Sequence, residues 1–230
     1  MFRILLSLIF MTVASTVASA SERVTLEIVL AVDSSASVDQ DEFDLQMKGL
    51  ADAFRNPDVV RAIQGAGPGG VAVGLVEWAC QDMQRMVVDW TVIRDAASAA
   101  ALATRIENTE RLVLGHCTAI GNLMAEAARL LHENQFVGDR QVIDVSGDGP
   151  VNQGLEPQVT RDAVVDSGVT VNGLAILSPY HHDLDAYYRT HVVGGPGSFL
   201  LVADGYPDFA RAIRLKLIRE IRGVAVAASE

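Results

Sequence analysis

Residues 24–37 of this chain read VTLEIVLAVDSSAS, an apolar run that changes abruptly into a polar loop. The run up to Val32 is β-branched and aliphatic, which is typical of a strand buried on both faces of a sheet. The loop places a carboxylate and two hydroxyls at alternate positions, Asp33, Ser35 and Ser37. Because alternate side chains of a tight loop can converge on one side, these three residues are candidate ligands for a single ion.

The rest of the chain alternates between helical and strand patterns. Helices are expected at 39–54, 95–106, 119–132, 157–167, 185–190 and 207–222, and further strands at 71–78, 86–93, 141–146, 169–177 and 199–202. The connection between 71–78 and 86–93 is so short that this pair must be antiparallel. The pattern predicts an α/β fold, namely a doubly wound, mostly parallel six-stranded sheet with helices on both faces and one antiparallel edge strand. The expected core aromatics are Phe43, Phe54, Trp78 and Trp90.

A second polar loop, Ser146-Gly147-Asp148-Gly149, follows the strand expected at 141–146. In a doubly wound sheet, ligands bind beyond the carboxyl ends of the strands, where the strand order reverses. If the strands before Asp33 and Asp148 are neighbours, both carboxylates can face a common ion. Gly147 and Gly149 would let the backbone turn sharply there, including into positive φ. Oxygen ligands of this kind suit Mg²⁺, which is a hard cation.

The first twenty residues differ in kind from the rest. Arg3 is their only charge, an apolar run follows, and Ala18-Ser19-Ala20 closes them. This pattern is typical of a secretory signal peptide. We therefore expect a signal peptide at 1–20 and one domain at 21–230, exported to the periplasm or secreted. No cysteine follows Ala20 to receive a lipid, and no later apolar run is long enough to span a bilayer, so we expect no membrane anchor.

The chain carries 29 acidic and 18 basic residues, a net charge of −11. Such a surface repels phosphate groups, which argues against nucleic acids and anionic lipids as partners. A bound divalent cation would offset part of this charge.

Cys80 and Cys117 are the only cysteines. Export would place them in an oxidising compartment, where we expect them to form a disulfide. The alternatives are two buried thiols or a nucleophilic Cys117 activated by His116. On the expected topology both cysteines lie at the ligand end of the sheet, which favours a disulfide that braces the loop before the helix at 119–132.

The motif Asp33-x-Ser35-x-Ser37, followed far downstream by Asp148-Gly149, resembles the metal-ion-dependent adhesion site of the von Willebrand factor A domain family. The resemblance extends over nearly the whole chain after residue 20 and is greatest to exported bacterial proteins of unknown activity. It implies a threonine ligand, best matched by Thr118, with Thr104, Thr109 or no residue as alternatives. It also implies that Ser35, Ser37 and Thr118 can bind the cation directly, and Asp33 and Asp148 directly or through water. Gly147 departs from the commoner pattern.

The resemblance implies a metal-dependent binding module of the cell envelope. We expect no catalytic residues, because Asp33 is followed two positions later by Ser35 and not by a second carboxylate, and no convincing lysine follows Asp148 to bind a phosphate. A protein partner would present an Asp or Glu carboxylate to the bound Mg²⁺, or to Mn²⁺ or Ca²⁺ in its place. One alternative is a Mg²⁺-dependent hydrolase of the phosphoryl-transfer type, because acidic groups at strand ends also hold catalytic Mg²⁺. Another is a scaffold with a vestigial site.

Two further patterns have structural alternatives. Ser37 with Gln40 also matches a capping box, in which the serine would serve only the helix. The sequence His181-His182-Asp183 could bind a transition metal, although a solvated loop that borders the metal face and helps to select the partner is the simpler interpretation.

Overall fold

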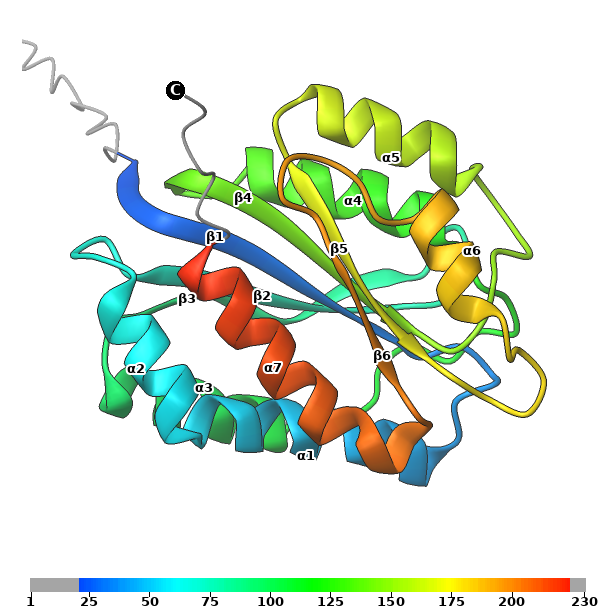
Figure 1. Ribbon diagram of the computed structural model, residues 1–230, viewed down its shortest axis with the longest axis horizontal. Coiled ribbons are helices and arrows are strands. Elements are labelled where there is room, and N and C mark those ends of the chain that lie inside the picture. Colours follow the sequence, from blue (N-terminus) through cyan, green and yellow to red (C-terminus); the bar gives the residue numbers. More distant parts are fainter. Residues whose placement is uncertain (1–20, 224–230) are drawn as a thin grey trace, which may run out of the picture.

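A computed structural model describes residues 21–223, so the expected signal peptide lies outside the described residues (Figure 1). The strands are β1 (Glu22–Asp33), β2 (Val71–Trp78), β3 (Gln84–Ile93), β4 (Phe136–Gly147), β5 (Thr170–Ile176) and β6 (Leu200–Ala203). The helices are α1 (Gln40–Arg55), α2 (Pro57–Gly65), α3 (Ala96–Glu107), α4 (Ile120–His132), α5 (Pro157–Asp166), α6 (Leu184–His191) and α7 (Phe209–Arg222), with a 3-10 turn η1 (Tyr206–Asp208) before the last. None of the helices within 21–223 is long and apolar enough to cross a bilayer.

The six strands form one sheet in the order β3-β2-β1-β4-β5-β6. Edge strand β3 is antiparallel to β2, and the other pairs are parallel. The predicted fold class is therefore confirmed. Strands β1 and β4 are direct neighbours, with Val32 paired to Ser146. The strand order reverses at this pair, so that the loops after β1 and β4 open at the same edge of the sheet.

Helices cover both faces of the sheet, and β1 contributes to both cores (Figure 1). Leu26, Ile28 and Leu30 point to one side and pack under α1, α2, α3 and α7. Val29 and Ala31 point to the other side and pack under α4, α5 and α6. Successive residues of a strand face opposite ways, so a strand covered on both faces is mainly apolar. Glu27 is the buried exception, and its carboxylate accepts hydrogen bonds from Asn134 and from the Gly138 N–H.

Three of the four expected core aromatics, Phe43, Phe54 and Trp78, are fully buried. Trp90 is only partly buried, because it lies on the edge strand β3, where it meets the ring of Phe136 edge-on at 6.3 Å. The expectation that Trp90 lies in the closed core is therefore wrong, and Trp90 lies at the margin of the sheet.

Two elements differ from the sequence prediction. Strand β4 begins at Phe136, five residues earlier than expected, because residues 136–140 pair with the beginning of β1. Helix α2 was missed: Asn56-Pro57 does end α1, but the Asn56 side chain accepts a hydrogen bond from the Asp58 N–H at 2.9 Å and so starts a second helix. Pro57 occupies its first turn, where a missing N–H has no cost.

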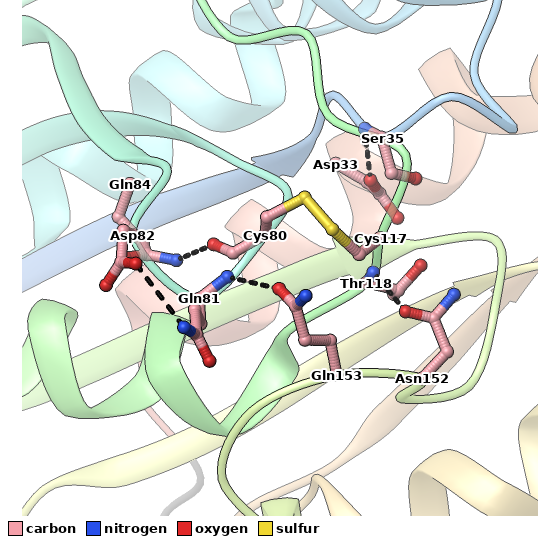
Figure 2. The surroundings of a disulfide bond; sticks show 10 residues. All are labelled: Asp33, Ser35, Cys80, Gln81, Asp82, Gln84, Cys117, Thr118, Asn152 and Gln153. Carbon is pink, nitrogen blue, oxygen red and sulfur yellow. Dashed lines mark hydrogen bonds between the residues drawn. A yellow bond between two sulfur atoms is a disulfide. The ribbon is translucent and has the colours of Figure 1, made fainter.

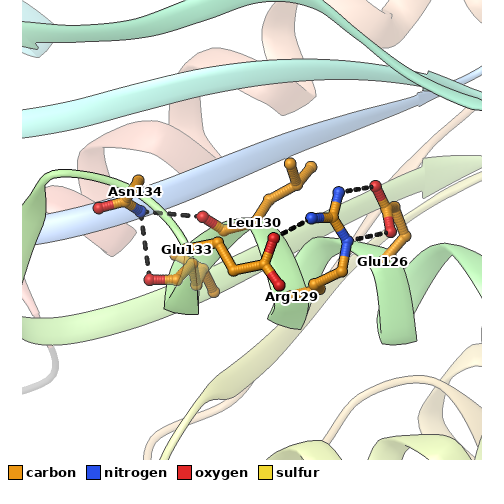
Figure 3. A network of polar contacts seen from close by, with 6 residues as sticks. Glu126, Arg129, Leu130, Glu133 and Asn134 are labelled. Atoms are coloured by element: carbon orange, nitrogen blue, oxygen red, sulfur yellow. Dashed lines mark hydrogen bonds and ion pairs between the residues drawn. The ribbon is translucent and has the colours of Figure 1, made fainter.

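The C-terminal end of α4 is held by Asn134 (Figure 3). Its side-chain amide donates to the carbonyls of Leu130 at 3.0 Å and Leu131 at 3.2 Å, which have no partner within the helix. Its side-chain oxygen accepts the N–H of Phe136 at 2.7 Å. Asn134 thereby ends α4 and starts β4. The ion pairs that Arg129 forms on the same helix are exposed, and solvent screening makes them weak.

A buried ion pair joins α7 to the sheet. The Nζ of Lys216, which is fully buried, lies 2.5 Å from Asp144 Oδ1 and 2.9 Å from Glu220 Oε1. Asn172 on β5 donates to the same Glu220 oxygen at 3.0 Å. Burial, and then the charge of Asp144, raises the pKa of Glu220 to about 8. At neutral pH Glu220 is therefore mainly protonated, and Lys216 is left to balance Asp144.

We expect Lys216→Met to lower the free energy of unfolding by about 3–5 kcal/mol, because the variant leaves the Asp144 carboxylate buried without a counter-charge. Urea denaturation measures this loss. The double variant Lys216→Met/Asp144→Leu removes both charges and should recover most of it. An equal loss in the single and double variants would show that the charge of Asp144 is not what Lys216 stabilises.

Candidate metal centre

The loops after β1 and β4 meet at the carboxyl edge of the sheet. The Ser37 hydroxyl donates to Asp148 Oδ1 at 2.8 Å, and its oxygen lies 3.0 Å from Ser35 Oγ. The backbone N–H of Ser35 donates to Asp33 Oδ1 at 2.8 Å. Direct contacts therefore connect four of the five predicted ligand residues.

A cavity of about 310 Å³ opens over these residues. Ser35 and Ser37 line it together with the fifth predicted residue, Thr118. Asp33 and Asp148 are buried. His116 and His181 also line the cavity, so that the loop expected to border the metal face does so through His181.

Thr118 is positioned by the loop that follows β4 (Figure 2). Its N–H donates to Asn152 Oδ1 at 2.8 Å, and its carbonyl accepts the Asn152 N–H at 3.0 Å. The alternative threonines hydrogen-bond elsewhere, Thr104 to the Ala100 carbonyl within α3 and Thr109 to the Arg105 carbonyl. Thr118 is thus the one of the three that lines the cavity. Sequence reasoning missed Asn152, since an asparagine in a loop has many possible partners.

Cys80 and Cys117 form the expected disulfide, which leaves no thiol for a nucleophilic reaction (Figure 2). The bond joins the turn after β2 to the residue before Thr118. Backbone contacts reinforce it: the Ala119 N–H donates to the Ala79 carbonyl at 2.8 Å. The Thr118 loop is therefore braced covalently against the β2–β3 turn.

The alternative in which Ser37 and Gln40 form a capping box is wrong. The N-cap of α1 is Asp39, whose carboxylate accepts the Glu42 N–H at 2.8 Å while Glu42 Oε2 accepts the Asp39 N–H at 2.9 Å. The Ser37 hydroxyl is not needed by the helix and is directed to Asp148 instead.

Neither glycine beside Asp148 makes a left-handed turn, and only Gly147 is required by close packing. Both Gly147 and Gly149 have φ outside the positive range, contrary to the expectation. A Cβ on Gly147 would lie 2.6 Å from Tyr188 Oη and 3.0 Å from Asp33 Oδ2. Glycine is therefore required by the close approach of Tyr188, and it does not prevent Asp148 from reaching Ser37.

The two carboxylates of the site lie in an environment that penalises their charge. Asp33 is fully buried, and its Oδ2 has no hydrogen-bond partner. Burial, and secondly the charge of Asp148, raises the pKa of Asp33 to about 7. Burial likewise raises the pKa of Asp148. Residues 21–223 contain no group of three or more His, Cys, Asp or Glu side chains that could hold a metal ion by themselves, so a cation here would depend on these carboxylates together with hydroxyls.

Arg111 holds the Asp33–Ser37 loop from behind. Its guanidinium donates to the carbonyls of Ser34 at 3.0 Å, Ser35 at 3.1 Å and Val38 at 2.9 Å, and also to the Ser34 hydroxyl. It lies 5.4 Å from the centre of the Phe43 ring. Sequence reasoning missed Arg111, because it stands in an irregular segment and binds backbone carbonyls that no motif reveals.

Arg111→Lys should loosen this loop, because lysine has no second nitrogen to bind the Ser34 hydroxyl while the first binds the carbonyls, and no planar group to lie over Phe43. We expect the free energy of unfolding to fall by about 2 kcal/mol and the amide protons of residues 34–38 to exchange faster with solvent. The matched control is Arg61→Lys at an exposed position, which should change neither quantity. Unchanged exchange in Arg111→Lys would contradict the assignment.

The raised pKa of Asp33 predicts how the metal-free protein responds to pH. The folded protein keeps the Asp33 proton up to about pH 7, whereas the unfolded chain releases it near pH 4. The Asp33 contribution to the free energy of unfolding therefore falls as pH rises between these values and stays low above them. Asp33→Asn has no titrating group at this position. The free energy of unfolding of the variant minus that of the original protein, both measured in EDTA, should therefore increase from about pH 5 to about pH 8. A difference that is constant across this range would contradict the prediction.

The family described as "Protein of unknown function (DUF1194)" matches residues 23–225. No curated protein matches the chain. Solved structures share its fold. Proximal thread matrix protein 1 from the mussel byssus, with a zinc-occupied MIDAS motif, has a TM-score of 0.62 and 15% identity over 89% of this chain and 50% of that chain. The present chain thus spans about half the length of the mussel protein.

Two further structures extend the comparison. The VWA domain of SpRpn10 has a TM-score of 0.57 and 15% identity over 88% of this chain and 100% of that chain. The pilus adhesin SpaC from Lactobacillus rhamnosus GG has a TM-score of 0.57 and 14% identity over 86% of this chain and 31% of that chain. At such identities the likeness is one of fold. The chain therefore has the fold of a von Willebrand factor A domain and belongs to the family of proteins of unknown function DUF1194.

Proposed function

We propose that this protein is a binding module that holds a divalent cation and recognises a carboxylate of a protein partner through it. The proposed ligands are Asp33, Ser35, Ser37, Thr118 and Asp148. One observation carries the proposal: the buried Asp33 carboxylate lies close to a second carboxylate and has an oxygen without a partner. A cation that binds both carboxylates would stabilise their charged forms, which burial otherwise disfavours.

The spacing of the oxygens suits Mg²⁺. Neighbouring oxygens of the set are 2.8 and 3.0 Å apart. An octahedral ion with ligands at about 2.0–2.1 Å holds adjacent oxygens about 2.9 Å apart. Hydroxyl and carboxylate oxygens are also the hard ligands that Mg²⁺ or Mn²⁺ prefers, while Ca²⁺ usually takes more ligands at longer distances.

The cation would make recognition of an acidic partner possible. The chain has a net charge of −11, so without a bound cation it repels another carboxylate. The cavity leaves the proposed site accessible from solvent between Ser35, Ser37 and Thr118. The similar structures include a matrix protein with a metal-occupied adhesion site and a pilus adhesin, which supports a binding function.

We also propose that residues 1–20 are a signal peptide and that residues 21–230 form the exported domain, in the periplasm or outside the cell. The Cys80–Cys117 disulfide supports export, because such bonds persist in oxidising compartments.

Mg²⁺ should raise the melting temperature of the protein. A ligand at a hundredfold excess over its dissociation constant stabilises the folded state by about 2.7 kcal/mol. Thr118→Ala and Asp33→Ala should abolish the response, whereas the matched controls Thr104→Ala and Thr109→Ala should retain it. Differential scanning calorimetry with Mg²⁺ and with EDTA measures the effect.

Carboxylate recognition is tested with a short peptide that contains one aspartate among glycines. It should bind in Mg²⁺ and not in EDTA, and Ser35→Ala should weaken binding. If Mg²⁺ leaves the melting temperature unchanged, the site is vestigial and the proposal is wrong. Turnover of a phosphate ester that is lost in Asp33→Ala would instead support a hydrolase.

A further inference from the structure

A groove with both apolar and charged residues lies beside the candidate metal centre. It has a volume of about 340 Å³ and is lined by Met83, Leu112 and Leu114, with Asp82 and Arg85 among its polar residues. The three apolar side chains are unusually exposed, Leu114 to 70%, Leu112 to 57% and Met83 to 43%. Apolar side chains that gather at one exposed place mark interaction surfaces more often than singly scattered ones do.

Buried hydrogen bonds hold these leucines outward. Glu77 on β2 is fully buried, and its Oε2 accepts the N–H of Leu112 at 2.8 Å and of Val113 at 2.9 Å. The Val113 carbonyl accepts the Ser34 hydroxyl at 2.7 Å, and its side chain is buried. In an extended segment alternate side chains point to opposite sides. With Val113 fixed inward, Leu112 and Leu114 are both directed to solvent.

The groove and the candidate metal centre share a wall. Leu114 stands two residues before His116, which lines the metal cavity, so their Cα atoms are at most about 7 Å apart. Between them, Gly115 forms a β-bridge with the proposed ligand Ser35. A Cβ on Gly115 would lie 3.1 Å from Met83 Sδ, which shows how closely the β2–β3 turn packs against this segment. The groove and the cavity of the candidate metal centre are therefore both lined by the same tightly packed segment.

We infer that the groove lined by Met83, Leu112 and Leu114 binds the same partner as the metal centre. The partner would be an extended protein segment that carries a large aliphatic residue two to four positions from the aspartate or glutamate that faces the cation. Leu114 and His116, which line the two cavities, have Cα atoms at most about 7 Å apart. One extended residue covers about 3.3 Å, so a spacing of two residues is the shortest that joins the cavities. Asp82 and Arg85 carry opposite charges that offset each other at the groove. The apolar side chains of the groove therefore determine which partner residue binds there. This inference rests on the proposed function.

The test compares three synthetic peptides: one with aspartate and a leucine two positions away, one with aspartate among glycines, and one with asparagine and the same leucine. In millimolar Mg²⁺ we expect the first to bind about tenfold more tightly than the second, because leucine burial adds affinity. The third should bind weakest. Leu114→Ser should remove the tenfold gain and leave the binding of the aspartate–glycine peptide unchanged. The control Val159→Ser, at an exposed valine on α5, should keep the gain.

The outcomes separate this inference from the proposed function. If the aspartate–glycine peptide binds in a Mg²⁺-dependent manner but leucine adds nothing, or adds as much in Leu114→Ser, the groove inference is wrong and the proposed function stands. If no peptide shows Mg²⁺-dependent binding, both are wrong. If Leu114→Ser instead converts a dimer to a monomer in analytical ultracentrifugation, the groove is occupied by a second copy, which also overturns the inference. Melting temperatures confirm that each variant is folded.

Discussion

The parallel ladder between β1 and β4 is the constraint on which both the fold and the candidate site depend. It joins strands that are more than a hundred residues apart and places the reversal of strand order at the centre of the sheet. Because the strands are parallel and in register at Val32 and Ser146, the residues after each strand end at the same edge. The contact between Ser37 and Asp148 follows from this pairing. A shifted register would separate the two loops.

Two of the places where the structure buries carboxylates differ in how the charge is balanced. In the middle of the sheet, Asp144 lies beside the buried Lys216, and Asn172 adds a hydrogen bond to Glu220. At the edge, Asp33 lies near Asp148 with an oxygen that has no partner. The first arrangement neutralises itself and serves the packing of α7. The second has no lysine or arginine paired to either carboxylate among the described residues, and the proposed cation would supply that counter-charge.

Several rigid supports hold the candidate site in place. Arg111 binds the carbonyls of the first loop, Asn152 holds Thr118, and a disulfide ties the Thr118 loop to the β2–β3 turn. A metal site needs such support, because its ligands must be held in place by groups that do not themselves bind the ion. Glu77 and Ser34 hold the segment next to Arg111 and present Leu112 and Leu114 to solvent. Ser34 also contacts Arg111, so the contacts that support the metal centre and those that support the groove meet at this residue.

The sequence alone determined the features that local patterns encode. The apolar run up to Val32 predicted a strand covered on both faces, and the Asp33–Ser37 motif predicted hydroxyls and a carboxylate at its end, since both depend only on neighbouring residues. Contacts between distant residues were decided by the tertiary structure. Strand β4 begins at Phe136 because β1 pairs with it, Ser37 binds Asp148 because Asp39 already caps α1, and Arg111 finds its carbonyls only after the loops have met. No local pattern records such partners, because their energy comes from burial and pairing that exist only in the folded chain.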